Sequence, residues 1–146
     1  MNPWLAVGVT GAVIALAAVL GLLWRSRRGR GREVAGQAFA IGSLPGLAEL
    51  APGATLVQFS TEYCASCPAT RRHLDRIARE RDGVRHLDID LTERPELASE
   101  LRILQTPTVF VLDGAGRLIR RFGGAPRREE LAAVLDDLVP LPEWSL

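Results

Sequence analysis

Residues 56–68, LVQFSTEYCASCP, decide the fold, because a strand pattern passes within a few positions into a cysteine pair and then a helix. Residues 55–60 are rich in Leu, Val and Phe, which is typical of a buried strand. From Cys67 to about Arg81 the apolar spacing is helical, and the opposite face of this helix is rich in arginine. A strand that leads directly into an amphipathic helix predicts an α/β fold.

After this helix the sequence continues to alternate between segments with strand-like and helix-like spacing of apolar residues. We expect three further strands and two further helices: strands at 84–90, 108–112 and 118–122, and helices at 92–101 and 126–139. The resulting order β-α-β-α-β-β-α indicates a mixed sheet with helices on both faces. We expect this domain at residues 37–140, followed by a C-terminal tail at 141–146.

Charge is unevenly distributed along the 146 residues, although the net charge is only +1. All 18 basic residues are arginines, and five of them lie within eight positions near the N-terminus: Arg25, Arg27, Arg28, Arg30 and Arg32. The remaining 13 arginines are outnumbered by 17 Asp and Glu. A nucleic-acid-binding domain carries its basic excess on the folded part, so nucleic acid is not expected as a partner.

Residues 4–24 are 21 consecutive uncharged positions. As a helix they would span roughly 31 Å, the thickness of a bilayer's hydrocarbon core. A cleaved signal peptide fits less well, because no basic residue precedes the run and no small-residue cleavage site follows it. A buried core helix is the remaining alternative. The sequence therefore predicts an N-terminal transmembrane anchor at 1–24.

An Arg/Gly-rich linker is expected at residues 25–36, directly after the apolar run. Positive charge is normally retained on the cytoplasmic side of a membrane. This predicts a single-pass protein whose folded domain is cytoplasmic, with an extracytoplasmic domain as the alternative. The glycines of the linker predict a flexible tether.

Cys64 and Cys67 are the only cysteines and form one C-x-x-C motif, Cys64-Ala65-Ser66-Cys67. The position of Cys64 at a helix N-terminus favours its thiolate. Cys67, one turn further on, is near enough to form a disulfide and faces the core. Such a pair can exchange disulfides in two steps, by attack of the first thiolate and resolution by the second.

Three other interpretations of the cysteine pair remain. Half of a zinc site is one, but the only histidines, His73 and His86, do not share its helix face, and there is no second C-x-x-C. A static structural disulfide is another, although so short a loop removes little chain entropy. The third is a domain that is not redox-active. No metal site is predicted.

Residues 54–139 resemble a thioredoxin. The resemblance rests on the motif at 56–68, on HLDID (86–90), on TPTVFVLDGAGRLIRRFGG (106–124) and on the final amphipathic helix. It implies a thioredoxin-like three-layer sandwich, here preceded by the transmembrane helix.

The resemblance also implies roles for particular residues. Cys64 is then the nucleophile and Cys67 the resolving thiol. Thr106 and Pro107, whose peptide bond is cis in this family, shape the groove for the substrate backbone. Tyr63 stands where the family usually has Trp and is expected to form one wall of that groove.

Two departures from the family pattern bear on the chemistry. Gln58 replaces a buried Asp that helps to move the proton of the resolving cysteine, and an amide cannot take up that proton. Gln58 and His86 are the two possible proton-transfer positions. Our hypothesis is that His86 partly replaces the missing base, since histidine titrates near neutrality, and the alternative is a half-exposed strand histidine. Ala65-Ser66 replaces the usual Gly-Pro and places no basic group between the cysteines, which favours a reducing potential.

These observations predict a membrane-anchored thiol–disulfide oxidoreductase that acts as a disulfide reductase without a bound cofactor. Its expected partners are protein disulfides and a reductant protein or small thiol, and we expect a monomer. Two alternatives remain. One is an outward-facing protein for cytochrome c maturation or disulfide handling, and the other is a non-catalytic membrane-tethered binding module.

Overall fold

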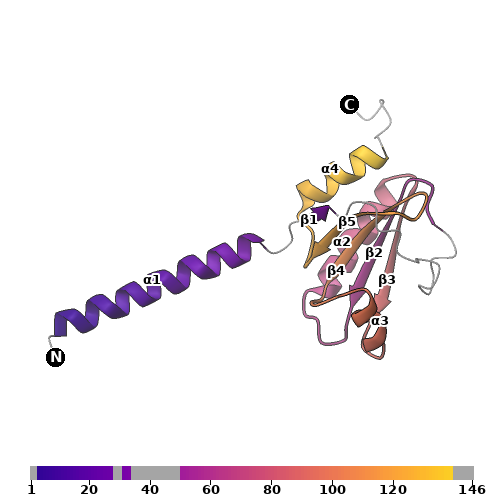
Figure 1. Cartoon of the computed structure of the whole chain (residues 1–146). Coiled ribbons are helices and arrows are strands. Elements are labelled where there is room, and N and C mark those ends of the chain that lie inside the picture. Colours follow the sequence, from indigo (N-terminus) through magenta and orange to yellow (C-terminus); the bar gives the residue numbers. More distant parts are fainter. Residues whose placement is uncertain (1–2, 28–30, 34–49, 140–146) are drawn as a thin grey trace.

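The computed structural model describes residues 3–27, 31–33 and 50–139. In chain order its elements are α1 Pro3–Arg27, β1 Gly31–Glu33, β2 Ala54–Ser60, α2 Cys67–Glu80, β3 Val84–Asp90, α3 Pro95–Glu100, β4 Thr108–Asp113, β5 Leu118–Gly123 and α4 Arg128–Leu138. From β2 to α4 this is the predicted order of strands and helices. Figure 1 shows the strands side by side in one sheet, with α1 extending away from the α/β body.

The sheet is mixed, as predicted, with the order β1-β5-β4-β2-β3. β2 runs parallel to β3 and antiparallel to β4, while β5 runs antiparallel to both β4 and β1. All seven residues of β2 are buried, because the strand has a neighbour on each side and helices above and below. This explains why residues 55–60 are rich in Leu, Val and Phe.

Two separate hydrophobic cores lie on the two faces of the sheet. On one face α2 and α4 contribute Leu74, Leu131 and Leu135, which pack against the strands. On the other face the rings of Phe59 and Phe110 meet edge to face, with centroids 4.9 Å apart, in the cluster that α3 helps to cover. The predicted arrangement of helices on both faces is therefore confirmed.

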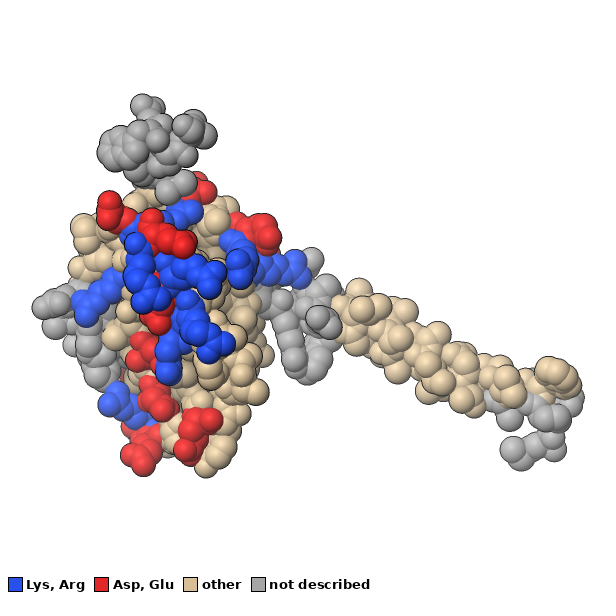
Figure 2. Space-filling view, turned by 180° about the vertical axis from the view of Figure 1, so that it is seen from behind, with Lys and Arg blue, Asp and Glu red and all other residues tan. Residues whose placement is uncertain are grey.

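Helix α1 is 25 residues long and presents its side chains to the surroundings. Those that the structure describes, Trp4 and residues 7–23, are all exposed. Figure 2 shows the described side chains of this helix in tan, since none of them is Lys, Arg, Asp or Glu. Within the described part of the chain, no helix is long and apolar enough to cross a membrane.

β1 is an element that the sequence did not predict, because residues 31–33 were assigned to the linker. The strand pairs with β5 in the register Gly31 to Phe122 and Glu33 to Arg120. A Cβ atom on Gly31 would lie 2.6 Å from the Phe122 ring, so only glycine allows this close approach. The segment Gly-Arg-Glu has no apolar alternation, and backbone pairing with the free edge of β5 is what makes it a strand.

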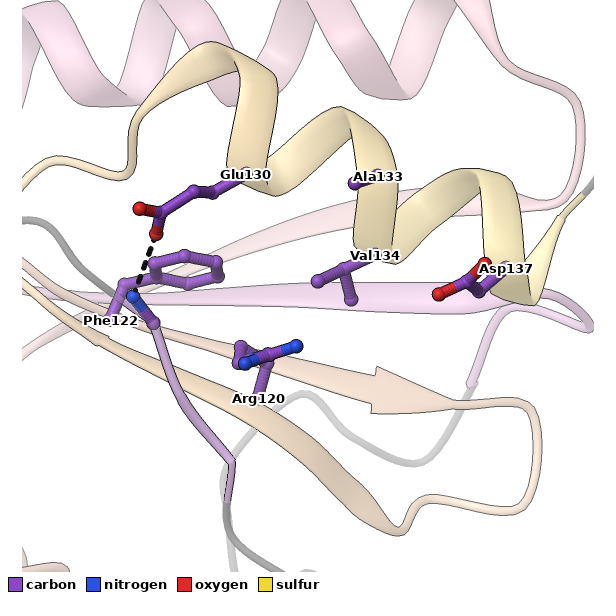
Figure 3. Close-up of a pocket in the computed structure, with 7 residues that line it drawn as sticks. Arg120, Phe122, Glu130, Ala133, Val134 and Asp137 are labelled. Atoms are coloured by element: carbon purple, nitrogen blue, oxygen red, sulfur yellow. Dashed lines mark hydrogen bonds between the residues drawn. The ribbon is translucent and has the colours of Figure 1, made fainter.

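The β1 strand also contacts α4. The Gly31 amide donates a hydrogen bond of 2.9 Å to the Glu130 carboxylate, which Figure 3 shows above the Phe122 ring. A hollow of about 310 Å³ lies beside this contact, between β5 and α4. We expected the linker to be a flexible tether throughout, and this prediction is wrong for residues 31–33, which form β1. Several predicted segments lie outside the described residues: the tail at 141–146, residues 28–30 and 34–36 of the linker, and residues 37–49 and 140 of the domain.

Candidate active site

The two cysteines lie where β2 ends and α2 begins, and they are joined by a disulfide with 5.4 Å between their Cα atoms. α2 starts at Cys67 itself, with Pro68 in its first turn. The loop is closed by hydrogen bonds from the Cys64 amide to the Thr61 carbonyl and from the Cys67 amide to the Cys64 carbonyl, each 3.2 Å long. Cys64 therefore lies three residues before the first residue of the helix.

The two sulfur atoms differ in accessibility. The Cys67 residue is only 2% exposed, whereas Cys64 is half-buried. The Ser66 hydroxyl lies 3.8 Å from the Cys64 sulfur, within hydrogen-bond range of a sulfur atom. An incoming disulfide can thus reach Cys64, while Cys67 can attack only from the interior side.

A second loop, which enters β4, contacts the loop that carries the disulfide. The peptide bond between Thr106 and Pro107 is cis, as the resemblance implied. The hydroxyls of Thr61 and Thr106 lie 3.2 Å apart and connect this loop to the cysteine loop. The Thr108 hydroxyl donates a hydrogen bond of 2.7 Å to the Gln105 carbonyl and holds the turn before the strand. Thr106 and Pro107 are therefore brought together with the cysteine pair.

Tyr63 precedes Cys64 and is 87% exposed. A side-chain hydrogen bond with Glu62 raises the pKa of its phenol, with a smaller contribution from desolvation. The ring is therefore neutral throughout the physiological range. Because its residue directly precedes the half-buried Cys64, the exposed ring is available to contact a substrate there.

Gln58 is fully buried beneath the first turn of α2. Its amide nitrogen donates a hydrogen bond of 3.2 Å to the Cys67 carbonyl. Among the described residues its Oε1 has no hydrogen-bond partner. Gln58 therefore supports the backbone of the buried cysteine and leaves one acceptor unused.

His86 is held by α2 rather than by Gln58. Its Nδ1 lies 2.6 Å from the Asp75 carboxylate, and its side chain is only 4% exposed. Its Nε2 is buried and, within the described part of the chain, makes no hydrogen bond. The structure thus places the ring on the same sheet face as Gln58, without a hydrogen bond between the two side chains.

Asp88 is a polar residue of this region that sequence analysis missed. It is the register partner of Gln58 in the parallel pairing of β2 and β3. Its carboxylate accepts a hydrogen bond of 2.9 Å from the Ser60 hydroxyl and forms an ion pair with Arg71 of α2. The signal was present in the sequence, because Asp88 follows His86 by one strand period and so lies on the same face.

The described residues contain no group of three or more His, Cys, Asp and Glu side chains that could hold a metal ion. A hollow of about 350 Å³ lies beside Glu62 and is lined by Asp90, Thr92, Glu93 and Arg94. The Asp90 carboxylate accepts hydrogen bonds from Thr92, which lower its pKa. The surface next to the cysteine loop is therefore negatively charged at neutral pH.

The sheet order, the disulfide at the strand-to-helix junction and the adjoining cis-proline define a dithiol–disulfide protein of the α/β class. The family model described as Thioredoxin matches residues 48–137, and the chain belongs to the thioredoxin family. The resemblance inferred from the sequence is thereby confirmed.

Two curated relatives are each 31% identical to the chain. One is the bifunctional thioredoxin reductase/thioredoxin of Mycobacterium leprae, matched over 86 residues, which are 58% of this chain and 19% of that protein. The other is the mitochondrial thioredoxin-3 of Saccharomyces cerevisiae, matched over 70 residues, which are 48% of this chain and 54% of that protein. The chain therefore spans about a fifth and about half of the lengths of these relatives.

Solved structures agree on the fold. Thioredoxin f2 of Chlamydomonas reinhardtii superposes with a TM-score of 0.56 at 21% identity, over 67% of this chain and 90% of that one. The oxidised form of mitochondrial thioredoxin 3 from Saccharomyces cerevisiae gives a TM-score of 0.51 at 26% identity, over 59% and 79%. The α/β body is thus a thioredoxin-like domain.

Proposed function

We propose that this protein is a thiol–disulfide oxidoreductase that reduces protein disulfides through Cys64 and Cys67. The observation that carries the proposal is the disulfide itself. It has one accessible and one buried sulfur, and the Thr106–Pro107 loop borders it. The relatives named thioredoxin support the same chemistry.

The reaction starts from the reduced pair. The Cys64 thiolate attacks one sulfur of the substrate disulfide, forms a mixed disulfide and expels the other substrate sulfur as a thiolate that takes up a proton. Cys67 then loses its proton and attacks the Cys64 sulfur. This step releases the second substrate thiol and leaves the Cys64–Cys67 disulfide. Two electrons pass to the substrate, and one dithiol or two molecules of a small thiol must return them to the pair.

The reductant is proposed to be a dithiol protein or a small thiol. The relative in Mycobacterium leprae is named as a bifunctional thioredoxin reductase/thioredoxin, which favours a thioredoxin reductase as the electron donor here. The test is turnover of a protein disulfide by the full-length chain in detergent, with a thioredoxin reductase and with glutathione in parallel. Absence of turnover with either donor, while the cysteines are reduced, favours the binding module instead.

We further propose that a side chain of β3 handles the proton of Cys67, because Gln58 cannot. His86 and Asp88 are the candidates, since both lie on the sheet face of Gln58 beneath α2. The variants His86→Asn and Asp88→Asn keep polar side chains of similar size. We expect one of them to change the pH dependence of Cys67 attack, measured as the rate of mixed-disulfide resolution. Unchanged pH profiles in both variants contradict this part of the proposal.

We propose that residues 4–24 anchor the protein in a membrane, with the α/β body on the cytoplasmic side. The support comes from the sequence and not from the described helices: it is the uncharged run of 21 residues and the five arginines after it. Gly31 follows Arg27 by four positions, so their Cα atoms are at most about 15 Å apart. The body would then remain close to the membrane surface and act on disulfides there.

Cysteine accessibility tests this orientation. A membrane-impermeant thiol reagent is applied to intact cells after reduction of the pair, and to lysed cells as a control. Cytoplasmic placement predicts modification of Cys64 only after lysis. Modification in intact cells would instead support the outward-facing role in cytochrome c maturation or disulfide handling. Recovery in the soluble fraction would contradict anchoring.

A further inference from the structure

Two large apolar side chains of the α/β body are left in solvent. Within residues 50–139, Tyr63 is 87% exposed and Leu104 is 94% exposed, and the other large hydrophobic side chains described there are buried or half-buried. A single exposed leucine needs no explanation on its own. The exposure of Leu104 needs an explanation because of its position relative to the disulfide.

Tyr63 and Leu104 lie on the two loops that meet beside the disulfide. The hydroxyls of Thr61 and Thr106 are 3.2 Å apart, and each apolar residue is two positions from one of them. β2 and β4 are adjacent antiparallel strands, with Phe59 opposite Thr108. The segment that leaves β2 and the segment that enters β4 therefore border the same end of the sheet, where the disulfide lies.

The loop that carries Leu104 is fixed at both ends. Before it, Arg102 adopts a left-handed conformation with φ of 50°, and the Arg121 guanidinium donates hydrogen bonds to the carbonyls of Leu101 and Arg102. After it, the Thr108 hydroxyl holds the Gln105 carbonyl at 2.7 Å. Leu101, three positions before Leu104, is buried and anchors the segment, whereas Leu104 itself points into solvent. Little conformational entropy remains to be lost when a ligand contacts this loop.

We propose that Leu104 is a specificity-determining residue. Together with Tyr63 it contacts a large apolar side chain that lies next to the target cysteine in an extended segment of the substrate protein. The substrates are then proteins whose reducible cysteine has Leu, Ile, Phe or Met as a near neighbour. This inference rests on the proposed reductase function, because the contact forms only while a substrate disulfide is at Cys64.

The charge around the disulfide favours the same class of substrate. Glu62, Asp90, Glu93 and Arg94 line the hollow beside the cysteine loop, so three carboxylates face one guanidinium there. The lowered pKa of Asp90 keeps its carboxylate charged at neutral pH. An acidic residue beside the target cysteine would be repelled by these groups. A neutral apolar neighbour loses little solvation and buries Leu104 in return.

The test compares two disulfide-linked peptides that differ only in Leu or Ser next to the cysteine. The full-length chain is used at one fixed detergent concentration, so that partitioning of the peptides cancels when variants are compared. We expect kcat/KM to favour the Leu peptide roughly tenfold in the unaltered chain. Tenfold corresponds to about 1.4 kcal/mol, which is less than complete burial of one leucine side chain.

Leu104→Ser should reduce this preference to about twofold or less, whereas Leu104→Met, which keeps an apolar side chain, should retain it. Reduction of 2-hydroxyethyl disulfide reports separately on the cysteine chemistry. Turnover of this small disulfide combined with equal rates for the two peptides in the unaltered chain overturns the proposal. A preference that survives Leu104→Ser also overturns it. Loss of turnover with the small disulfide contradicts the reductase function itself, and the specificity inference with it.

Discussion

The disulfide end of the sheet and the β1–α4 side of the same body differ in how their polar groups are used. At the β1–α4 side the Glu130 carboxylate accepts a hydrogen bond from the Gly31 amide, and the Phe122 ring lies beneath that carboxylate (Figure 3). At the disulfide end Gln58 keeps an acceptor without a partner in the described residues, and Tyr63 stays in solvent. The two hollows are of similar size, about 310 and 350 Å³. An accessible sulfur and an exposed aromatic ring, and not the volume of a hollow, distinguish the reactive region from the structural one.

The largest expected effect is at the accessible sulfur. Cys64→Ser should lower disulfide turnover by roughly a thousandfold or more, because it removes the nucleophile of the first step. Cys67→Ser should instead accumulate the mixed disulfide, since the resolving thiolate is absent. Both outcomes are measured by turnover of a protein disulfide and by mass spectrometry of the trapped species. Asp137→Asn, on the β1–α4 side, is the matched control and should leave turnover within about twofold.

A large effect of another kind is expected at Phe122, which is fully buried between the sheet and α4. Phe122→Ala should lower the free energy of unfolding by about 3–5 kcal/mol, because it leaves a cavity in the core. Urea unfolding measures the change. At a temperature where the variant is folded, its turnover should stay close to that of the unaltered chain. A parallel loss of turnover would contradict the separation of the two regions.

A smaller effect on stability is expected from Gly31→Val, which tests how closely β1 packs against β5. The added side chain would meet the Phe122 ring and Arg120, so the strand must shift, at a cost of about 1–3 kcal/mol. Hydrogen exchange at the amides of β5 should become faster, because β1 covers that edge. Glu130→Gln keeps an acceptor oxygen for the Gly31 amide and serves as the milder control. Protected β5 amides in Gly31→Val would show that β1 does not need the close approach.

The smallest expected effect concerns pH. Burial lowers the pKa of His73, and Arg128 of α4 and Arg76 of α2 lower it further, while Glu80 opposes them. The unfolded chain therefore binds a proton at this position more readily than the folded chain does. The stability linked to His73 is fully present above the ordinary pKa near 6.5 and is lost as the pH falls toward the folded value.

His73→Gln removes this titration, and the free energy of unfolding should then fall less between pH 7 and pH 5. Urea midpoints across that range measure the slope. A slope equal to that of the unaltered chain would show that His73 does not contribute. His73 lies on α2 away from the cysteines, so turnover should follow the same pH profile in both proteins.

The sequence predicted those parts of the molecule whose pattern is local. The strand at 55–60, the helix from Cys67 and the strands at 108–112 and 118–122 follow from the local spacing of apolar residues. Gly31 and Phe122 are 91 positions apart in the sequence. Because their pairing rests on backbone hydrogen bonds, no side-chain pattern indicates it. The partner of His86 was missed for a similar reason, because only the packing of α2 on β3 brings Asp75 to its ring.

The redox midpoint of the Cys64–Cys67 pair tests the central claim most directly. The full-length chain is equilibrated in graded thiol–disulfide buffers, and the free thiols are counted by the mass shift on alkylation. The account predicts a two-electron transition at a reducing potential, near the general figure for thioredoxin of about −270 mV. A midpoint near about −120 mV, the range of a strong disulfide oxidant, would contradict the reductase. A pair that forms no disulfide in any buffer would contradict dithiol chemistry altogether.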